Sequence, residues 1–224
     1  MEIKAVLFDM DGVLVDSEYT MASAAIAALS EYGVSAKHDD FVEFIGAGED
    51  RFVGGVAEKY GVKYEIPMKD RAYEIYGQMI EAESIGFEGV KELFDSLRQM
   101  GIKMAVCSSA DAVKVRYNLR SLGVDRDFFD AVLTGSDVTR KKPNPDIFLL
   151  AAERIGVEPC HCLVVEDAIN GIFAARSAGM YHAAVTTSFD RETLVCECAP
   201  DFVCDSVKEI SNIVSEHRKI GDGK

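Results

Sequence analysis

Positively charged side chains are scarce in this chain of 224 residues, and their scarcity limits what the protein can bind. Lys and Arg total 24 against 38 Asp and Glu, which gives a formal net charge of −14 at pH 7. So acidic a surface repels a phosphate backbone, which excludes a nucleic-acid-binding protein that acts through bulk charge. Any site for an anion therefore needs local cations to overcome the field of the whole molecule.

Long apolar runs are also missing. No run approaches the ~20 residues that span a bilayer, which excludes an integral membrane protein. The N-terminus has neither the longer apolar core nor the small-residue cleavage site of a signal peptide, so we expect a cytoplasmic location. Hydrophobic residues still make up 48% of the chain, which excludes general disorder and allows one large domain or a domain with an insertion.

Two sequence signatures of ligand-binding proteins are absent. The six cysteines include the pairs at 160 and 162 and at 196 and 198, whose C-x-C spacing is not the usual C-x-x-C of zinc sites. We expect reduced thiols, because a chain of this size does not need disulfides, and a zinc site built from both pairs is the alternative. No Gly-rich Walker loop is found either, so nucleotide binding by such a loop is not supported.

Short apolar runs alternate with segments of helical periodicity. The apolar runs predict strands at residues 3–8, 102–107, 131–134, 162–165, 182–186 and, more weakly, 201–204. The helical segments lie at 90–100, 112–122, 146–155 and 169–178, and each is followed by a glycine that is typical of a helix C-terminus. This alternation predicts an α/β fold with a Rossmann-like parallel sheet.

Residues 17–85 interrupt the alternation, because nearly all of this stretch is helical in pattern. Helices are predicted at 17–32, 39–45, 49–60 and 69–83, separated by Gly46, Gly48, Gly61 and Pro67. A single crossover helix needs far fewer residues. We therefore predict an α/β core of residues 1–16 and 87–224 and an inserted all-helical cap of residues 17–86, with hinges at 12–17 and 84–88. The tail from about residue 217 is expected to be frayed.

Polar side chains with the chemistry of an active site follow four of the predicted strands. In open α/β sheets, ligands bind at the carboxyl ends of the strands, which lie on one edge. The residues at these ends are Asp9, Asp11, Ser108, Ser109, Lys142, Glu166 and Asp167. Each has an ordinary explanation as a turn residue, a helix cap or a surface charge. Their coincidence at four strand ends favours a shared site.

The charges of this group suit a metal ion and a phosphoryl group. Carboxylates placed near one point repel one another and raise one another's pKa values, so they stay ionised only with a cation between them. Oxygen ligands favour Mg²⁺, which completes its shell with water and substrate phosphate. Lys142 would add a second positive charge for the negative charge of a phosphoryl transition state.

The same residues carry a resemblance to a known family. The run Asp9-Met10-Asp11-Gly12-Val13-Leu14-Val15-Asp16-Ser17 resembles the first motif of the haloacid dehalogenase-like (HAD) phosphohydrolases. Ser108, the Lys142-Pro143 pair and the Glu166-Asp167 pair resemble the second, third and fourth motifs, in the right order. The helical insertion resembles the cap of the subgroup that contains β-phosphoglucomutase and sugar-phosphate phosphatases. The resemblance covers residues 3–190.

This resemblance implies a role for each of the three residues that carry out the chemistry. Asp9 is expected to be the nucleophile that attacks phosphorus and forms an aspartyl-phosphate. Asp11 is expected to protonate the leaving oxygen and then to activate water as a base. Lys142 is expected to stabilise Asp9 and the transferring group. An Asp at position 11, rather than Thr or Ser, fits transfer to water.

The resemblance also implies metal and substrate ligands. Asp9, the backbone carbonyl of Asp11, and Asp167 are expected to hold Mg²⁺, while Glu166 ligates the metal or orients a water bound to it. Ser108 is expected to bond a phosphoryl oxygen, with Ser109 beside it at the same strand end. The implied partner is a small-molecule phosphate ester, and the protein is expected to be a monomer or a weak homodimer.

The cap decides between two reactions. The resemblance implies that a phosphoglucomutase carries a His after the first motif and an Arg and a Lys in its cap. This chain has Thr20-Met21, Glu49 and Gln78 at those places, and Arg51 is the nearest substitute for the Arg. We therefore favour a Mg²⁺-dependent phosphatase that acts on a small phosphorylated metabolite, most simply a sugar phosphate. A β-phosphoglucomutase-type mutase and a catalytically idle HAD-fold regulatory protein are the alternatives.

Four cap residues have two interpretations each. Gly48, with Gly46, is expected to let the cap backbone approach the active site, although an ordinary turn explains it equally well. Glu18 and Glu49 would bond sugar hydroxyls from the cap side, but solvated helix charges are the more common explanation for such residues.

Overall fold

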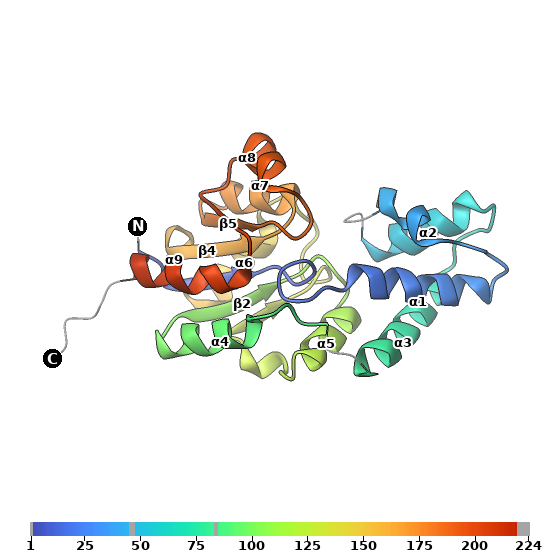
Figure 1. Ribbon diagram of the computed structural model, residues 1–224, viewed down its shortest axis with the longest axis horizontal. Helices are drawn as coiled ribbons and strands as arrows, with labels where there is room; N and C mark the ends of the chain where they lie inside the picture. The colour runs from blue at the N-terminus through green and yellow to red at the C-terminus, as the bar shows by residue number, and fades with distance from the viewer. Residues whose placement is uncertain (1, 45–47, 83–84, 219–224) are drawn as a thin grey trace.

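The computed structural model describes residues 2–44, 48–82 and 85–218, and its centre is a six-stranded parallel sheet (Figure 1). The strands are β1 (Ala5–Phe8), β2 (Lys103–Cys107), β3 (Ala131–Leu133), β4 (Cys162–Glu166), β5 (Tyr181–Val185) and β6 (Phe202–Cys204). They lie in the order β3-β2-β1-β4-β5-β6. All six predicted strands are confirmed, because a parallel strand buried on both faces appears in the sequence as an unbroken apolar run.

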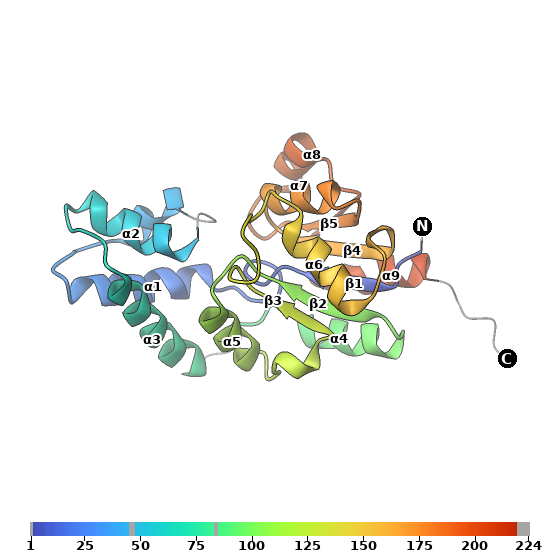
Figure 2. The same ribbon diagram turned by 180° about the vertical axis from the view of Figure 1, so that it is seen from behind.

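Helices cover both faces of the sheet (Figures 1 and 2). They are α4 (Val90–Gln99), α5 (Ala112–Ser121), α6 (Asp146–Ile155), α7 (Ile169–Ser177), α8 (Arg191–Cys198) and α9 (Ile210–His217). Val6 and Phe8 of β1 pack in one apolar cluster with α4, α5 and α9, whereas Leu7 packs in another with α6 and α7. Alternate side chains of β1 thus contact opposite helix layers.

The last two helices of the sheet unit, by which we mean all of these strands and helices, were not predicted from the sequence. In α8, only Leu194 and Cys198 are buried, and in α9 only Ile210 and Val214 are. A helix of about two turns with a single pair of apolar positions carries too little periodicity to be recognised. The helix α9 also runs to His217, where a frayed tail was expected to begin.

The stretch between β1 and β2 folds into a helical unit with an apolar cluster of its own. This unit comprises α1 (Glu18–Ser30), the 3-10 helix η1 (His38–Phe44), α2 (Glu49–Lys59) and α3 (Ile66–Ala82). Leu29, Val53 and Tyr76 are among the residues buried inside it. It lies beyond the carboxyl edge of the sheet (Figures 1 and 2). The predicted domain boundaries at residues 16 and 86 stay a prediction.

The helix predicted at residues 39–45 is confirmed as far as Phe44, as a 3-10 helix. One expectation for the helical unit was wrong. Pro67 was expected to separate helices, but α3 already begins at Ile66, which places Pro67 in its first turn. Proline is tolerated there because the amide groups of a first turn have no partner inside the helix.

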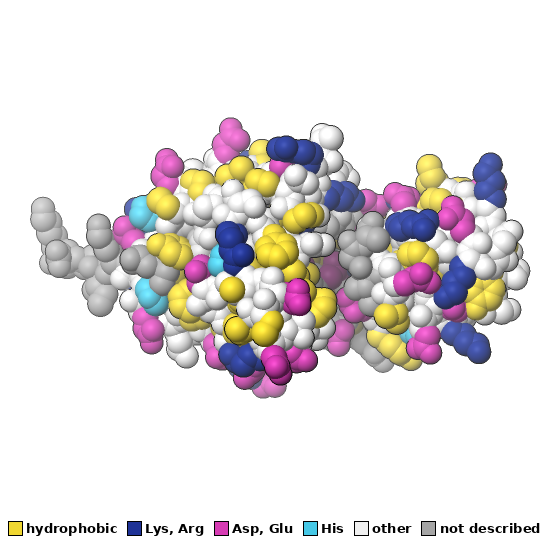
Figure 3. Space-filling model, turned by 90° about the horizontal axis from the view of Figure 1, so that it is seen from above, with side chains coloured by type: hydrophobic (Ala, Val, Ile, Leu, Met, Phe, Trp, Pro, Cys, Tyr) yellow, Lys and Arg dark blue, Asp and Glu magenta, His cyan; other side chains and the backbone are white. Residues whose placement is uncertain are grey.

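The molecular surface narrows where the helical unit meets the sheet unit (Figure 3). Asp and Glu side chains lie on both sides of this narrowing in the view shown. Among the helices of the described residues, none has the length and apolar character required to cross a membrane.

Candidate active site

Strand register brings the predicted site residues to one edge of the sheet. Phe8, the last residue of β1, lies opposite Val106 of β2 and Val165 of β4. The amide of Asp9 continues the ladder by donating to the carbonyl of Val165 at 2.9 Å, and that of Ser108 donates to Leu133 at 3.1 Å. Asp9 and Ser108 are therefore fixed by backbone pairing rather than held on free loops.

Lys142 lies at the centre of this edge. Its Nζ atom is 2.5 Å from Asp9 Oδ1, 2.6 Å from Glu166 Oε1 and 2.9 Å from the carbonyl of Cys107. Burial opposes the charged form of this lysine, but the carboxylates of Asp9 and Glu166 outweigh it and raise the pKa of Lys142. The lysine therefore carries its charge into the site, as its predicted role requires.

Three carboxylates share the edge with Lys142. Asp9, Glu166 and Asp167 are buried, and each offers an oxygen within 4.8 Å of the others. Burial raises the pKa of Asp9 to about 7, with Lys142 opposing this shift and Glu166 adding to it. Burial and the charges of Glu166 and Asp9 also raise the pKa of Asp167 well above its ordinary value. One ammonium group does not compensate three buried carboxylates, so the site fits a bound oxygen-liking cation.

Two glycines leave the room that these carboxylates occupy. A Cβ atom added at Gly171 would lie 1.9 Å from the carboxyl carbon of Glu166. One added at Gly12 would lie 2.0 Å from Asp167 Oδ2, and Gly12 also has a φ of +79°, where glycine is favoured. Any side chain at either position would displace a carboxylate of the group.

Asp11 has partners of its own on α5 and at the start of α1. Its Oδ1 atom accepts hydrogen bonds from Asn118 Nδ2 at 3.0 Å and from the hydroxyl of Ser17, and it lies 3.1 Å from Lys114 Nζ. Three donors on one oxygen hold the carboxylate in a fixed orientation beside the edge where Asp9 lies. The predicted metal contact through the backbone carbonyl of Asp11 stays a prediction.

The two serines after β2 differ in their surroundings. Ser108 is buried, and its Oγ atom accepts a hydrogen bond from the amide of Ala110 at 3.1 Å. The hydroxyl proton of Ser108 is therefore free to be donated to another group. Ser109 is partly exposed, and its carbonyl lies 3.5 Å from Lys141 Nζ.

The residues of the helical unit that were predicted to contact the site do not all lie near it. Gly48 has a φ of +85°, and a Cβ atom there would lie 3.6 Å from Lys141 Nζ, so its backbone does approach the sheet unit. Gly46 lies outside the described residues. Arg51 is not brought to the site with the others: it pairs with Glu58 at 2.9 Å and lies over the ring of Phe44, and both partners belong to the helical unit.

A second set of polar residues joins the helical unit to Asp11, and sequence reasoning missed most of it. Lys114 and Asn118 lie four residues apart on α5, so both reach Asp11 from one helix face. The hydroxyl of Tyr76 donates to Asn118 Oδ1 at 2.6 Å, and Glu49 lies 3.6 Å from Lys114. The sequence signal that could have revealed this set is a pair of polar residues four positions apart on a helix, beside its apolar face.

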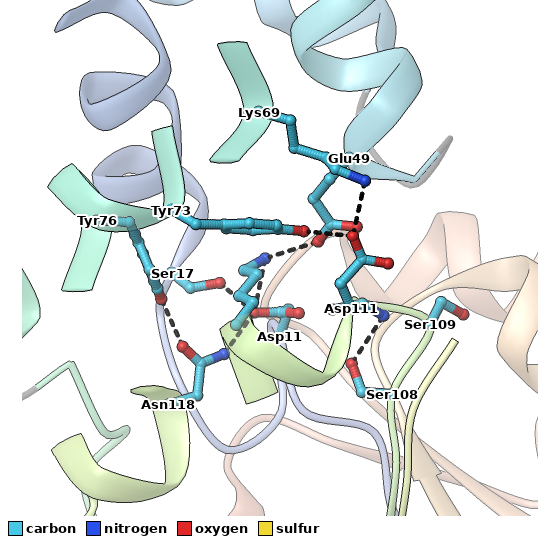
Figure 4. A network of polar contacts seen from close by, with 12 residues as sticks. Asp11, Ser17, Glu49, Lys69, Tyr73, Tyr76, Ser108, Ser109, Asp111 and Asn118 are labelled. Carbon is cyan, nitrogen blue, oxygen red and sulfur yellow. Dashed lines mark hydrogen bonds and ion pairs between the residues drawn. The ribbon is translucent and has the colours of Figure 1, made fainter. Parts of the chain in front are cut away.

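Figure 4 shows how these residues converge: from the helical unit, Tyr76 points toward Asn118 and Tyr73 toward Asp111, and Glu49 lies above Asp11. Burial raises the pKa of Glu49, with Lys114 opposing the shift and Asp11 adding to it. Glu49 is therefore a buried side chain rather than a solvated helix charge, and its contact with sugar hydroxyls stays a prediction. Ser188 is a further unpredicted residue, and its hydroxyl donates to Asp167.

The sequence matches a known family over most of its length. The model of the haloacid dehalogenase-like hydrolases matches residues 3–179. Protein SUPPRESSOR OF QUENCHING 1, chloroplastic, from Arabidopsis thaliana is 42% identical over 94% of this chain. The chain spans only about 20% of the length of that relative. A phosphoglycolate phosphatase of Vibrio parahaemolyticus is 30% identical, and the match covers 96% of this chain and 97% of that protein.

A solved structure agrees with these matches. The crystal structure of CbbY from Rhodobacter sphaeroides in complex with phosphate is similar with a TM-score of 0.82 and 25% identity. The similarity covers 93% of this chain and 96% of that one. With its motif residues gathered at one sheet edge, this chain therefore belongs to the haloacid dehalogenase-like hydrolases, as a phosphoric monoester hydrolase of that family.

Proposed function

We propose that this protein is a Mg²⁺-dependent phosphatase that hydrolyses a small phosphorylated metabolite, most simply a sugar phosphate, through an aspartyl-phosphate. The observation that carries the proposal is the pairing of the Asp9 carboxylate with buried Lys142, with oxygens of two further carboxylates within 4.8 Å of Asp9. A nucleophile, a cation for the phosphoryl oxygens and metal ligands then lie within a few ångströms of one another.

Mg²⁺ fits the donor set, since oxygen ligands with excess negative charge are what this ion selects. Asp9 and Asp167 would hold it, with Glu166 as a further ligand or as the partner of a bound water. When bound, the ion would draw charge from the phosphoryl group and offset the repulsion among the carboxylates.

The residues of the chain would perform two displacements at phosphorus. In the first, an oxygen of Asp9 attacks phosphorus and the bond to the ester oxygen breaks, while the proton of Asp11 passes to the departing oxygen. In the second, water attacks the phosphorus of the aspartyl-phosphate, Asp11 accepts its proton, and the bond to Asp9 breaks. Lys142 and the Ser108 hydroxyl would bind phosphoryl oxygens in both steps.

The pairing of Glu49 favours hydrolysis over a mutase reaction. A mutase has to hold a bisphosphate at both ends, which requires cations on the side of the helical unit. In this chain, Glu49 stands where the family resemblance implies an Arg, and its carboxylate lies 3.6 Å from Lys114. A carboxylate at that place repels a second phosphate, which leaves water as the acceptor.

A phosphate-release screen tests this proposal. Sugar phosphates, phosphoglycolate, nucleotides and pyrophosphate are offered with Mg²⁺, and EDTA is expected to abolish release. Asp9→Asn is expected to lower kcat by at least about 10³-fold with an unchanged circular dichroism spectrum, because the amide cannot act as the nucleophile. The control is Asp95→Asn, an exposed residue of α4.

The outcomes separate the hypotheses. Full activity of Asp9→Asn would refute the nucleophile assignment. Isomerisation of a hexose 1-phosphate primed by bisphosphate, without phosphate release, would establish the mutase instead. No turnover of any ester would establish an idle protein with this fold.

Location and assembly are part of the proposal. We propose a cytoplasmic protein that is a monomer or a weak homodimer, with a small-molecule phosphate ester as its ligand. The relative in Arabidopsis thaliana has the word chloroplastic in its name, so a plastid is the competing location. Light scattering after size exclusion gives the assembly, and cell fractionation gives the location.

A further inference from the structure

The side of the site that faces the helical unit contains a buried lysine shared by two carboxylates. Lys114 is only 6% exposed, and its Nζ atom lies 3.1 Å from Asp11 Oδ1 and 3.6 Å from Glu49 Oε1. Asp11 belongs to the sheet unit and Glu49 to the helical unit. The ammonium group of Lys114 is therefore neutralised from both units before any substrate arrives.

A second lysine on this side is neutralised in the same way. Lys69 Nζ lies 2.9 Å from Asp50 Oδ1 and 2.9 Å from Asp111 Oδ2, and the hydroxyl of Tyr73 also donates to Asp111, at 3.1 Å. Figure 4 shows Lys69, Tyr73 and Glu49 meeting above Asp111. We call Asp11, Glu49, Asp50, Lys69, Asp111 and Lys114 the interface cluster.

Charges around the interface cluster do not make it positive. Lys141 lies at its rim beside Gly48. The hydrogen bond from Tyr64 lowers the pKa of Asp50, and Lys69 and Lys141 add to this shift. Glu18 faces the cluster from α1, and its pKa is raised by burial, with Lys114 opposing the shift and Asp11 adding to it. Residues 45–47, outside the described part, carry no charge. Carboxylates thus outnumber ammonium groups on this side.

The cluster lies where the leaving group of a substrate has to be. In the proposed reaction, Asp9 attacks phosphorus from the carboxyl edge of the sheet. Asp11, which donates a proton to the departing oxygen, is itself a member of the interface cluster and pairs there with Lys114. An anionic leaving group would be desolvated beside Glu49 and Asp111, with no buried ammonium among the described residues of the cluster left unpaired. Hydroxyl groups, by contrast, can donate to these carboxylates.

We propose that Glu49 is a specificity-determining residue: by pairing with Lys114, it restricts the enzyme to phosphate esters of uncharged, hydroxyl-bearing leaving groups and discriminates against leaving groups with a carboxylate or second phosphate. This inference rests on the proposed phosphatase function and names the substrate class of the same site.

A matched substrate pair tests the inference on the unmodified enzyme. 2-Phosphoglycolate and 2-hydroxyethyl phosphate have the same length and differ in a carboxylate against a hydroxymethyl group. The expected kcat/KM is at least about tenfold higher for the hydroxyethyl ester. The reason is that the carboxylates of the partly buried interface cluster would repel the carboxylate of phosphoglycolate. A preference for phosphoglycolate would overturn the inference while leaving the phosphatase function intact.

A variant tests whether Glu49 causes the discrimination between the two substrates. In Glu49→Gln, Lys114 keeps only Asp11 as a partner, so the ratio of kcat/KM values is expected to move toward phosphoglycolate by about tenfold. Glu58→Gln lies on the same helix, exposed and paired with Arg51, and should leave the ratio unchanged. A folded Glu49→Gln enzyme with the ratio of the unmodified enzyme would overturn the assignment.

The two failures can be told apart. p-Nitrophenyl phosphate serves as a substrate with a leaving group that needs no protonation, so its hydrolysis reports phosphatase chemistry alone. If it and every other ester resist hydrolysis, the phosphatase function fails, and the inference fails with it. If the Gln variant does not fold, the substrate ratio of the unmodified enzyme decides.

Discussion

Lys142 shows how a single residue ties stability to chemistry in this protein. Its ammonium group lies between Asp9 and Glu166 with almost no access to water. A buried charge of this kind is tolerated only when its partners are close, and removing one partner leaves the others uncompensated. The ammonium group of Lys142 therefore both positions the nucleophile and stabilises the folded protein.

At this scale we predict a magnesium-dependent stability defect. Lys142→Met keeps an unbranched apolar side chain, shorter by the terminal nitrogen, but leaves the carboxylates without their ammonium group, so the free energy of unfolding in EDTA should fall by about 3 kcal/mol. Excess Mg²⁺ should restore part of the loss, because an ion that binds only the folded state stabilises it. Urea denaturation with and without Mg²⁺ measures both effects.

The neighbouring lysine gives the control for this prediction. Lys141→Met removes an exposed ammonium group and should change the free energy of unfolding by less than about 0.5 kcal/mol. Equal losses in the two variants, or a loss in Lys142→Met that ignores Mg²⁺, would contradict the argument.

At the scale of elements, two helices shape the site. The first turn of α7 follows directly on Glu166 and Asp167, and Gly171 within it gives Glu166 the space for its carboxylate. The helix α5 presents Lys114 and Asn118 to Asp11 from one face. One helix therefore supports the proposed metal ligands and the other the proposed acid and base.

A substitution in α7 tests this support. Gly171→Ala should force Glu166 to move, because the new Cβ atom would lie 1.9 Å from its carboxyl carbon. We expect the Mg²⁺ concentration for half-maximal activity to rise at least about tenfold, as for other changes beside metal ligands. Asn170→Ala, at an exposed position of the same helix, is the control. An unchanged Mg²⁺ requirement in a folded Gly171→Ala protein would rule out this role.

At the scale of the whole molecule, the two units are joined by buried polar contacts rather than by apolar packing alone. Tyr76 and Asn118 are both buried, and their hydrogen bond of 2.6 Å crosses from α3 to α5. The amide nitrogen of Asn118 also donates a hydrogen bond to Asp11, at 3.0 Å. The placement of the helical unit and the orientation of Asp11 are thus coupled through one side chain.

Removing the Tyr76 hydroxyl should weaken this junction. Tyr76→Phe leaves the Asn118 oxygen buried without a donor, so the free energy of unfolding should fall by about 1–3 kcal/mol in urea denaturation. The kcat/KM value should fall as well, because the amide that orients Asp11 loses its own anchor. Tyr60→Phe, whose exposed hydroxyl contacts Asp40 at 2.7 Å, serves as the control. Equal stability of Tyr76→Phe and the unmodified protein would contradict the coupling.

Much of the sheet unit was predictable because its signals are local. Each residue of β1 is buried, so the strand appears as an unbroken apolar run. The parallel topology then places every strand end on one edge, which is why Asp9, Lys142 and Glu166 were predicted to meet. By contrast, the short helices α8 and α9 have too few periodic positions to be recognised.

The sequence by itself determined the parallel α/β architecture, the motif residues and the excess of negative charge, because patterning and composition are properties of the chain alone. Only the tertiary structure decided which side chains share a charge. Asn118 is 107 positions from Asp11 along the chain, and Glu49 and Lys114 come from different units. No local pattern encodes such pairings, since they depend on how two packed units present their faces to each other.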